Sequence, residues 1–439
     1  MRIGQIAIDV APLRESRDYR LLFSGRFVSM AGNAVATTAA NWQVYGLTHN
    51  SFAVGLLTLA SGCGMLLGLV AGGMLADRHD RRTLIMAVQL PQALLSALLM
   101  ANSLVRHPAL WPLYLITFCI GLCSGLASPA STATTPALVG LDRLPAAAAL
   151  NATASQVGQL GGPALAGLLI AGPGLASCYA IDAVCLAVFG LAMFRISPLP
   201  PVIKAQRPGL RSFAEGLGYV RHNGVLGGML LVDTNAMLFG MPSALFPALA
   251  STHFHGGSAT FGLLVAAPGL GALIGAATSG WTGRVRRPGV VIIGAGIVWG
   301  GAIALFGVVD SLPLALVFLA IAGMGDLISE VLRNALLQRY TPDQLRGRVS
   351  SLYLAQVTGA PALGNVEAGG VAWLVSPVFS VVSGGLACVA GAVALGALIP
   401  ALRNSSLSGA EPDAGLDTGL NAGLDLKSAA GNAARVSRP

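Results

Sequence analysis

Charged side chains are scarce in this chain. Asp, Glu, Lys and Arg together make up 10% of its 439 residues, whereas 54% are hydrophobic and 57 are glycine. The mean hydropathy of +0.72 exceeds what the core of a soluble domain requires. The composition therefore argues against an ordinary soluble domain and predicts an all-α membrane protein that crosses the bilayer repeatedly.

Several chemical signatures are also missing. The chain has no phosphate-binding G-x-x-x-x-G-K-[ST] loop, so we do not expect ATP to drive a reaction cycle. The six cysteines lie in apolar segments and form no C-x-x-C pair, which favours small buried side chains. His253 and His255 are two residues apart but lack further metal ligands. We expect no enzyme activity, no catalytic residues, no metal site and no cofactor.

The basic residues, which give a formal net charge of +8, are spread over short loops. A nucleic-acid-binding protein gathers them on one face, so nucleic acid is not an expected partner. Charged residues in 1–19, before the first long apolar run, argue against a cleavable signal peptide; they are Arg2, Asp9, Arg14, Glu15, Arg17 and Asp18.

Long apolar stretches recur along the rest of the chain. A bilayer core about 30 Å thick requires roughly 20 apolar residues per helix, and the pattern predicts twelve transmembrane helices. The expected spans are 20–47, 52–76, 83–105, 109–133, 147–171, 175–195, 222–250, 258–283, 289–309, 313–337, 348–374 and 377–401. Lysine and arginine fall in alternate loops, and Arg106 is the one basic residue on the opposite side. Both termini are therefore expected in the cytoplasm.

A connection rich in proline and basic residues divides the spans into two sets of six. Thr135-Pro136 followed by Asp142 is echoed by Thr341-Pro342 and Asp343, which favours two six-helix pseudo-repeats. After Arg403 the composition turns to Asn, Ser, Gly, Ala and Asp, which is typical of a disordered tail. The expected parts are a cytoplasmic N-terminal segment (1–19), a first bundle (20–195), a linker (196–221), a second bundle (222–401) and a disordered cytoplasmic tail (402–439).

The segment 72–82 reads G-G-M-L-A-D-R-H-D-R-R between two apolar stretches. Glycines near a helix end allow a neighbouring helix to approach, and Asp77 can pair with an arginine or face a helix N-terminus. Such contacts form in one state and break in another, which predicts a conformational latch of Gly73, Asp77, Arg78, Arg81 and Arg82. The alternative is that the arginines only anchor the loop on the cytoplasmic side.

This loop resembles the G-x-L-A-D-R-x-G-R-R-x-x-L signature of the major facilitator superfamily, with Asp80 at the second glycine position. The resemblance implies two six-helix bundles, 1–195 and 222–401, that rock about a central cavity.

The stretch 158–167 resembles the G-x-x-x-G-P-x-x-G-G pattern of exporting antiporters in that superfamily, with Ala166 in place of one glycine. The matching residues are Gly158, Gly162, Pro163 and Gly167, and they favour export over uptake. Small residues three and four apart allow helices to touch, and Pro163 bends its helix. Ordinary membrane helix packing is the alternative.

Ionisable residues inside apolar spans are costly and are therefore candidates for a proton-coupling or substrate cavity. Asp326, Glu330 and Arg333 are four and three residues apart, on one face of a helix. An acid paired with arginine can release its proton when a cation approaches and take one back later. A fixed ion pair with Arg333 reaching toward the cytoplasm is the alternative.

Three further residues are cavity candidates, namely Asp233, Glu367 and Arg26. For Arg26, reaching toward the membrane surface is an equal alternative. Asp182 lies close to the outer end of its predicted span, so we expect it at the membrane interface.

Stretches along the chain up to about residue 400 resemble the enterobactin exporter family of Gram-negative bacteria; they include 26–29, 47–49, 54–56, 70–78, 135–140, 287–289, 337–338, 341–342 and 347–348. This resemblance implies a proton antiporter that exports a siderophore from cytoplasm to periplasm. It also implies an inner-membrane location, with protons, lipid and outer-membrane efflux components as partners. The cluster at 326–333 is not part of that family's pattern, which leaves a different siderophore open as the cargo. A broad-range drug/proton antiporter, a lysophospholipid flippase-like protein and a membrane sensor remain alternatives.

Overall fold

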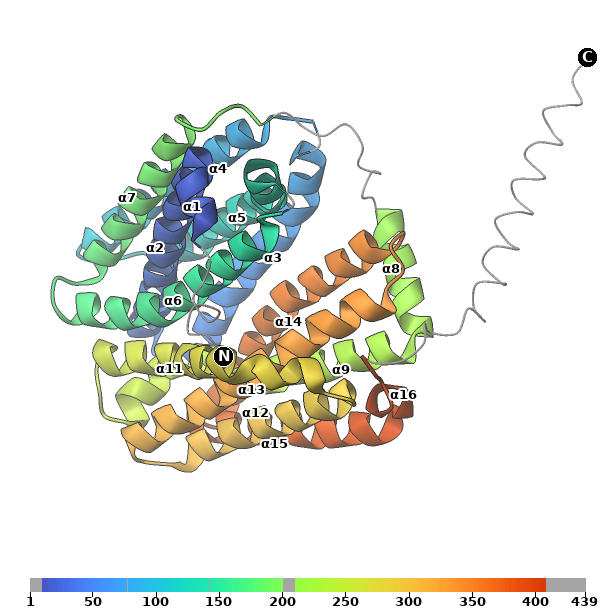
Figure 1. Cartoon of the computed structure of the whole chain (residues 1–439). Helices are drawn as coiled ribbons and strands as arrows, with labels where there is room; N and C mark the ends of the chain where they lie inside the picture. Colours follow the sequence, from blue (N-terminus) through green and yellow to red (C-terminus); the bar gives the residue numbers. More distant parts are fainter. Residues whose placement is uncertain (1–9, 77, 141, 200–209, 408–439) are drawn as a thin grey trace, which may run out of the picture.

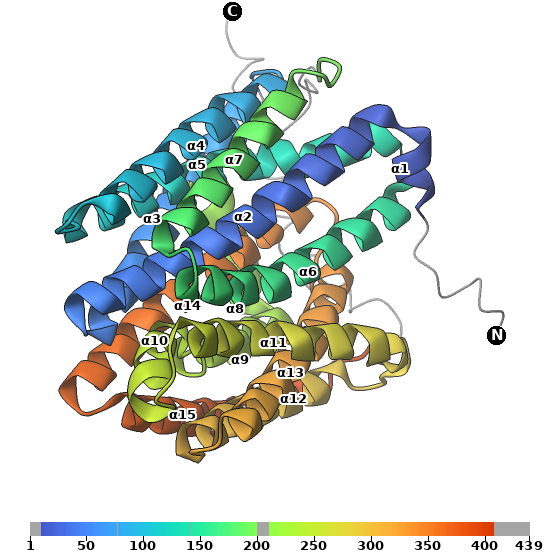
Figure 2. The same cartoon turned by 90° about the vertical axis from the view of Figure 1, so that its left-hand side faces the viewer.

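The computed structural model describes residues 10–76, 78–140, 142–199 and 210–407, and within these ranges all regular structure is helical. Figure 1 shows α1–α7 gathered in one lobe and α9–α15 in the other, and Figure 2 shows the same division from the side.

The first lobe begins with a short helix that leads into six long ones. Their bounds are α1 Ala11–Glu15, α2 Arg17–Thr48, α3 Ser51–Ala76, α4 Arg81–Leu104, α5 Leu110–Val139, α6 Leu144–Ala171 and α7 Leu175–Met193.

The second lobe follows α8 (Leu210–His222) and also has six spans. The helices are α9 Gly224–Phe239, α11 Ser258–Thr278, α12 Pro288–Val308, α13 Leu312–Tyr340, α14 Arg346–Leu374 and α15 Pro377–Leu398. Shorter pieces are η2 Ser243–Leu245, α10 Phe246–Ala248, η3 Leu249–His253, η4 Ser279–Arg284 and α16 Pro400–Arg403.

Within the described residues, nine helices are long and apolar enough to cross a membrane, counting α9 to η3 as one. Three more, α2, α6 and α14, have 32, 28 and 29 residues and carry more polar side chains. Together they make the twelve spans, and the prediction of an all-α protein with two six-helix halves is confirmed.

The seventh span differs from the single helix predicted at 222–250. Helix α9 ends at Phe239, and Gly240, Met241 and Pro242 follow in a non-helical connection. Pro242 cannot supply the backbone donor that a continuous helix needs. At this break the side-chain oxygen of Asn365 on α14 accepts hydrogen bonds from Ala244 N and Ser243 Oγ, both at 2.7 Å, so these donors are satisfied outside a continuous helix.

Glycines set the distance between α3 and α5. A Cβ added at Gly64 or Gly68 would lie 2.1 Å from the carbonyl oxygens of Phe118 or Leu122, so the two backbones are in direct contact. Gly121 of α5 faces α3 in the same way. Spacing of small residues by four allows this close approach along one helix face.

The two ends of the bundle differ in how the halves meet. We call the end where α2 starts the linker end, and the end where α2 turns into α3 the loop end. Helix α3 packs against α14 and α6 packs against α11. These contacts join residues near the loop end, such as Gly55 with Asn365 and Gly167 with Gly262. The halves are therefore in contact at the loop end.

Segments flanking the bundles are partly helical. Helix α8 falls within the predicted linker, and its Glu215 forms a 2.5 Å ion pair with Arg348 of α14. At the start of the predicted disordered tail, Ser405 is 2% exposed and its hydroxyl accepts a hydrogen bond from Gly289 N. Residues 402–407 are thus packed against the second bundle, whereas 408–439 lie outside the described residues.

Candidate functional site

A buried arginine on α13 organises the main polar cluster. Arg333 Nη1 lies 2.5 Å from Asp233 Oδ1 of α9, and Nη2 lies 3.4 Å from Asp326 Oδ1, about two turns earlier on α13. The side chains of Arg333 and Asp233 are 5% and 1% exposed. The structure therefore joins two candidates that lie 100 positions apart in the sequence.

Uncharged side chains complete this arrangement. Arg333 donates to Ser329 Oγ at 3.0 Å, and Gln356 of α14 donates to Asp233 Oδ2 at 3.0 Å. Gln356 also donates to Leu230 O, which fixes its amide between α14 and α9. Three helices thus converge on one buried ion pair, a geometry in which both charges have partners.

The other members of the α13 face are more open. Asp326 is 47% exposed at its side chain, and Glu330 is exposed and has no ion pair with another described residue. The prediction that Asp326, Glu330 and Arg333 share one face agrees with α13 being helical through all three. Of the two carboxylates near Arg333, that of Asp233 is buried and that of Asp326 is half-exposed.

Arg26 is the cavity candidate of the first half. It lies on α2, nine residues from the start of that helix. Arg26 is half-buried and makes no ion pair within the described part of the chain. Among the described residues, Arg26 is therefore a cation without an ion pair, whereas Arg333 of the second half is paired with Asp233.

Glu367 is separate from this cluster. It is half-buried on α14, eleven residues beyond Gln356 and so about 16 Å farther along the helix axis. The structure does not bring it together with Arg333.

Two arginines of the charged loop after α3 bind carbonyl groups of the first half. Arg81 donates to Ala133 O of α5 at 3.0 Å, and Arg82 donates to Phe194 O after α7 at 2.8 Å. Arg78 is exposed, Gly73 is half-buried, and Asp77 lies outside the described residues.

Asp80, which departs from the superfamily signature, has a structural role in the same loop. Its carboxylate accepts hydrogen bonds from Thr83 N at the start of α4 (3.0 Å) and from Leu199 N (2.7 Å). Asp80 therefore caps α4 and ties the loop to the chain that follows α7.

The glycine-rich stretch of α6 lies where the halves meet. A Cβ added at Gly167 would lie 2.7 Å from Ser258 O and 3.0 Å from Gly262 Cα of α11, and Ser258 Oγ donates to Gly167 O. Gly162 instead faces Ala34 of α2 in its own half.

The other two residues of that motif differ in their surroundings. The carbonyl of Pro163 would lie 2.6 Å from a Cβ at Gly262, whereas nothing surrounds a Cβ at Gly158. Two of the four motif residues, Pro163 and Gly167, therefore touch the opposite half.

The family of this chain follows from comparison with known proteins. A family model described as "Transmembrane secretion effector" matches residues 7–416. The chain belongs to this family of the major facilitator superfamily. Enterobactin exporter EntS of Citrobacter koseri is 31% identical over 396 residues, which cover 90% of this chain and 95% of that protein.

Solved structures show the same transporter fold. A mutant of the nucleoside transporter NupG has a TM-score of 0.71 at 12% identity, covering 87% of this chain and 99% of that one. A D-xylose–proton symporter has a TM-score of 0.66 at 14% identity, and the match covers 88% of this chain and 99% of that chain. The protein is a multi-pass membrane transporter.

Some polar residues of this transporter escaped the sequence analysis. Asp182 was expected at the membrane interface; the structure shows that its side chain is 0% exposed inside the first half, which its position in the sequence did not predict. Helix α7 turns it toward α2 and α4, where Ser96 Oγ lies 2.5 Å from its carboxyl. Gln356, the partner of Asp233, was also missed, because one uncharged amide in a span carries no distinguishing signal.

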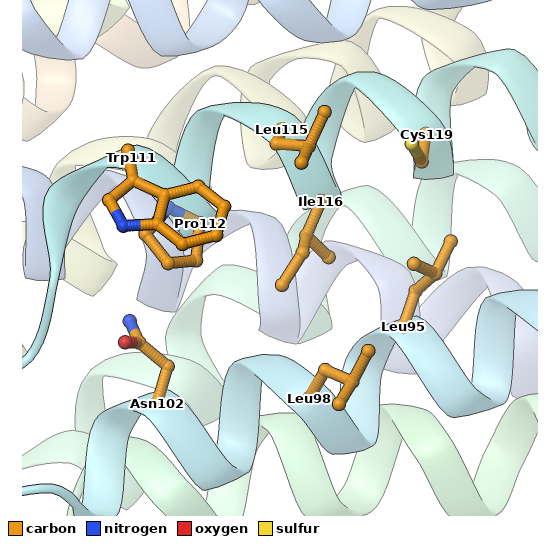
Figure 3. Close-up of a pocket in the computed structure, with 8 residues that line it drawn as sticks. All are labelled: Leu95, Leu98, Asn102, Trp111, Pro112, Leu115, Ile116 and Cys119. Carbon is orange, nitrogen blue, oxygen red and sulfur yellow. The ribbon is translucent and has the colours of Figure 1, made fainter.

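A groove of about 410 Å³ lies between α4 and α5, away from the charged cluster. Figure 3 shows Leu95, Leu98 and Asn102 of α4 facing Trp111, Leu115 and Ile116 of α5 across it. Its lining is mostly apolar and lies in the first half alone, so it is not the site where the two halves would share a cargo.

Proposed function

We propose that this transporter exports a siderophore from cytoplasm to periplasm in exchange for protons. The observation that carries the proposal is 31% identity to an enterobactin exporter over 90% of this chain, with both lengths nearly matched. Similarity over so much of the chain supports a shared cargo class more strongly than a shared fold alone.

The distribution of basic residues supports an orientation in the inner membrane. Arg78, Arg81 and Arg82 lie at the linker end, as do both ends of the described chain, whereas Arg106 lies at the loop end. Since basic loops remain in the cytoplasm, we place the linker end and both termini there. The state described is then closed toward the periplasm.

Arg26 is our candidate for contacting the cargo. Siderophores bind iron through acidic oxygens, so an exported siderophore offers negative charge or strong acceptors to a cation. The charge of Arg333 is balanced by Asp233 and Asp326, whereas Arg26 makes no ion pair with any described residue. A guanidinium is well suited to such oxygens because it donates several hydrogen bonds in one plane.

Proton coupling is assigned to the α13 cluster. Arg333 lies 2.5 Å from the carboxylate of Asp233 and 3.4 Å from that of Asp326, and Asp326 is the more exposed of the two acids. A proton on Asp326 would leave Arg333 to Asp233 alone, and loss of that proton would restore the three-residue arrangement. Glu330 lies on the same face and gives a second accessible acid.

During alternating access, contacts at the two ends of the bundle would form and break in turn. At the loop end, Gly167 and Gly262 bring α6 and α11 together. At the linker end, Arg81 and Arg82 hold the charged loop to the first half in the state described. We infer that the latch to the second half forms when the linker end closes, with Gly73, Asp77 and Arg78 near the contact.

The test is siderophore secretion by iron-starved cells in which the gene is deleted, then restored as wild type, Arg26→Gln or Asp310→Asn. Asp310 is 94% exposed in a loop and serves as a matched charge-loss control. We expect deletion to abolish secretion with accumulation inside the cell, and wild type and Asp310→Asn to restore it. Unchanged secretion together with new sensitivity to unrelated drugs would instead identify a broad-range drug antiporter.

A further inference from the structure

Asp182 is an anomaly inside the first half. Its side chain is on α7, is 0% exposed and has one described polar contact, with Ser96 Oγ of α4 at 2.5 Å. Ser96 is also 0% exposed. The second carboxyl oxygen, Oδ1, is buried and has no hydrogen-bond partner among the residues that the structure describes.

The helices around Asp182 supply no positive charge. Helix α7 packs against α2, α4 and α6. On α2 the carboxyl faces Gly32, where an added Cβ would lie 3.0 Å from Oδ1. No Lys or Arg occurs within one turn of Gly32, Ser96 or Asp182, and none occurs anywhere in α6. The cation of α2 nearest to Gly32 is Arg26, six residues and so roughly 9 Å away along the axis.

The remaining titratable groups near Asp182 are two thiols and a phenol, which carry no positive charge. Cys178, Tyr179 and Cys185 lie within one turn on α7 itself, and the corresponding turns of α2 and α4 carry none. Tyr179 donates to Gln43 Oε1 of α2 at 2.6 Å. No side chain on the facing turns of α2 and α4 can therefore neutralise a carboxylate at Asp182.

A carboxylate in this position would be very unfavourable. An ionised acid needs several donors or a cation once it leaves water, and here it would have one donor and an unsatisfied oxygen. A carboxylic acid can donate its own O–H to Ser96 Oγ, and 2.5 Å is at the short limit for such a bond. The unsatisfied Oδ1 is then a neutral carbonyl oxygen, which costs much less.

We propose that Asp182 is a proton-binding site of the first half, protonated in the state with the loop end closed. Asp182 would be a second proton site, separate from the Arg333 cluster. Its role in transport rests on the proton-driven export proposed above. The ligand is the proton itself, and Ser96 is a positioning residue.

Contacts of α2 connect this acid to the meeting point of the halves. Trp42 of α2 stacks on Phe261 of α11 with ring centroids 5.4 Å apart, across the halves. The next residue, Gln43, is bound to Tyr179, which lies three residues before Asp182. When the loop end opens and the Trp42–Phe261 stack separates, α2 can shift against α7 and admit water to the acid.

The experiment is infrared spectroscopy of the full-length protein in lipid nanodiscs at neutral pH, in H₂O and D₂O. The measured signal is the carbonyl stretch of protonated carboxylic acids. We expect Asp182→Asn to lose one component of this band and Asp310→Asn to leave it unchanged. Ser96→Ala should keep that component at a shifted frequency, because the acid loses its hydrogen-bond partner. An acid band that is identical in wild type, Asp182→Asn and Ser96→Ala would overturn the proposal.

A second measurement separates the site from the transport function. Proteoliposomes containing wild type or Asp182→Asn are given enterobactin as the probe, and proton movement per transported molecule is recorded. A lower ratio in the variant supports the role of Asp182 in coupling, and an unchanged ratio overturns that role. If wild type moves no protons at all, the proposed antiport is wrong, while the infrared result still decides whether Asp182 holds a proton.

Discussion

At the residue scale, Arg333 and Arg26 differ in their surroundings, and these surroundings suit different roles. Arg333 is 5% exposed at its side chain, with carboxylates on α9 and α13. Arg26 is half-buried without a carboxylate partner among the described residues. The surroundings of Arg333 suit an internal charge balance that protonation of a carboxylate can change. The surroundings of Arg26 leave a cation available to a ligand.

Removing one member of the buried pair should destabilise the protein more than removing both. Asp233→Asn leaves Arg333 without its nearest carboxylate, and Arg333→Gln leaves Asp233 with no cation. Loss of one partner of a buried pair costs about 3 kcal/mol. We expect both single variants to lower the thermal unfolding temperature in detergent, and the double variant to recover at least half of the loss. Additive losses would show that the two side chains do not interact.

Arg26 should affect cargo affinity rather than folding. Arg26→Gln removes a charge-assisted hydrogen bond, worth about 1.5–3 kcal/mol, so the dissociation constant for enterobactin should rise roughly tenfold or more. Arg26→Lys keeps the charge and should lose less. Binding by isothermal titration calorimetry measures this, and equal affinity in wild type and Arg26→Gln would remove Arg26 from the cargo site.

The sequence predicted part of the residue-scale picture. Helical spacing correctly placed Asp326, Glu330 and Arg333 on one face, since that depends on one helix only. The pairing of Arg333 with Asp233 depends on how α13 packs against α9, which spacing within one helix does not contain. The burial of Asp182 was missed for the same reason, because distance from a helix end gives depth and not the direction in which a side chain points.

At the element scale, helices touch where glycine removes the side chain. Gly167 and Gly262 bring α6 and α11 into backbone contact at the loop end. Twelve apolar stretches were enough to locate the spans, because length and hydropathy are local properties. The break after Phe239 was missed although Gly240 and Pro242 were visible, since Pro is tolerated in many membrane helices, including α5 and α14.

A larger side chain at Gly167 should hold the loop end apart. Gly167→Val places methyl groups where Ser258 O and Gly262 lie, and overpacking of this kind costs roughly 1.4 kcal/mol or more. That shifts the balance between states about tenfold toward an open loop end. The control is Gly161→Val, because Gly161 is exposed and nothing surrounds its added Cβ. Double electron–electron resonance between labels on α6 and α11 reports the separation, and equal distance distributions for both variants would contradict this account.

At the scale of the whole molecule, the halves meet at the loop end, and the charged loop at the linker end is bound to its own half. In an alternating-access cycle, both features fit a state that is closed at the loop end. The resemblance to the superfamily predicted this architecture. Neither the resemblance nor the composition predicted which end is closed, because both states share one sequence and differ by a small free energy.

The orientation can be measured directly. In a variant whose six native cysteines are replaced by serine, Arg106→Cys should react with a membrane-impermeant maleimide added outside intact spheroplasts. Arg78→Cys should react only after lysis, because its loop lies at the other end of the bundle. The reverse labelling pattern would place the linker end in the periplasm and contradict the proposed orientation.

The central claim is export of a siderophore driven by protons. The most direct measurement uses inside-out membrane vesicles containing the full-length protein, with enterobactin outside and a pH gradient that is acidic inside. We predict enterobactin accumulation that stops when the gradient is collapsed and is abolished by Asp326→Asn, while Asp310→Asn behaves as wild type. Accumulation that is unaffected by collapse of the gradient would contradict proton antiport, and no accumulation of enterobactin under any gradient would contradict siderophore export.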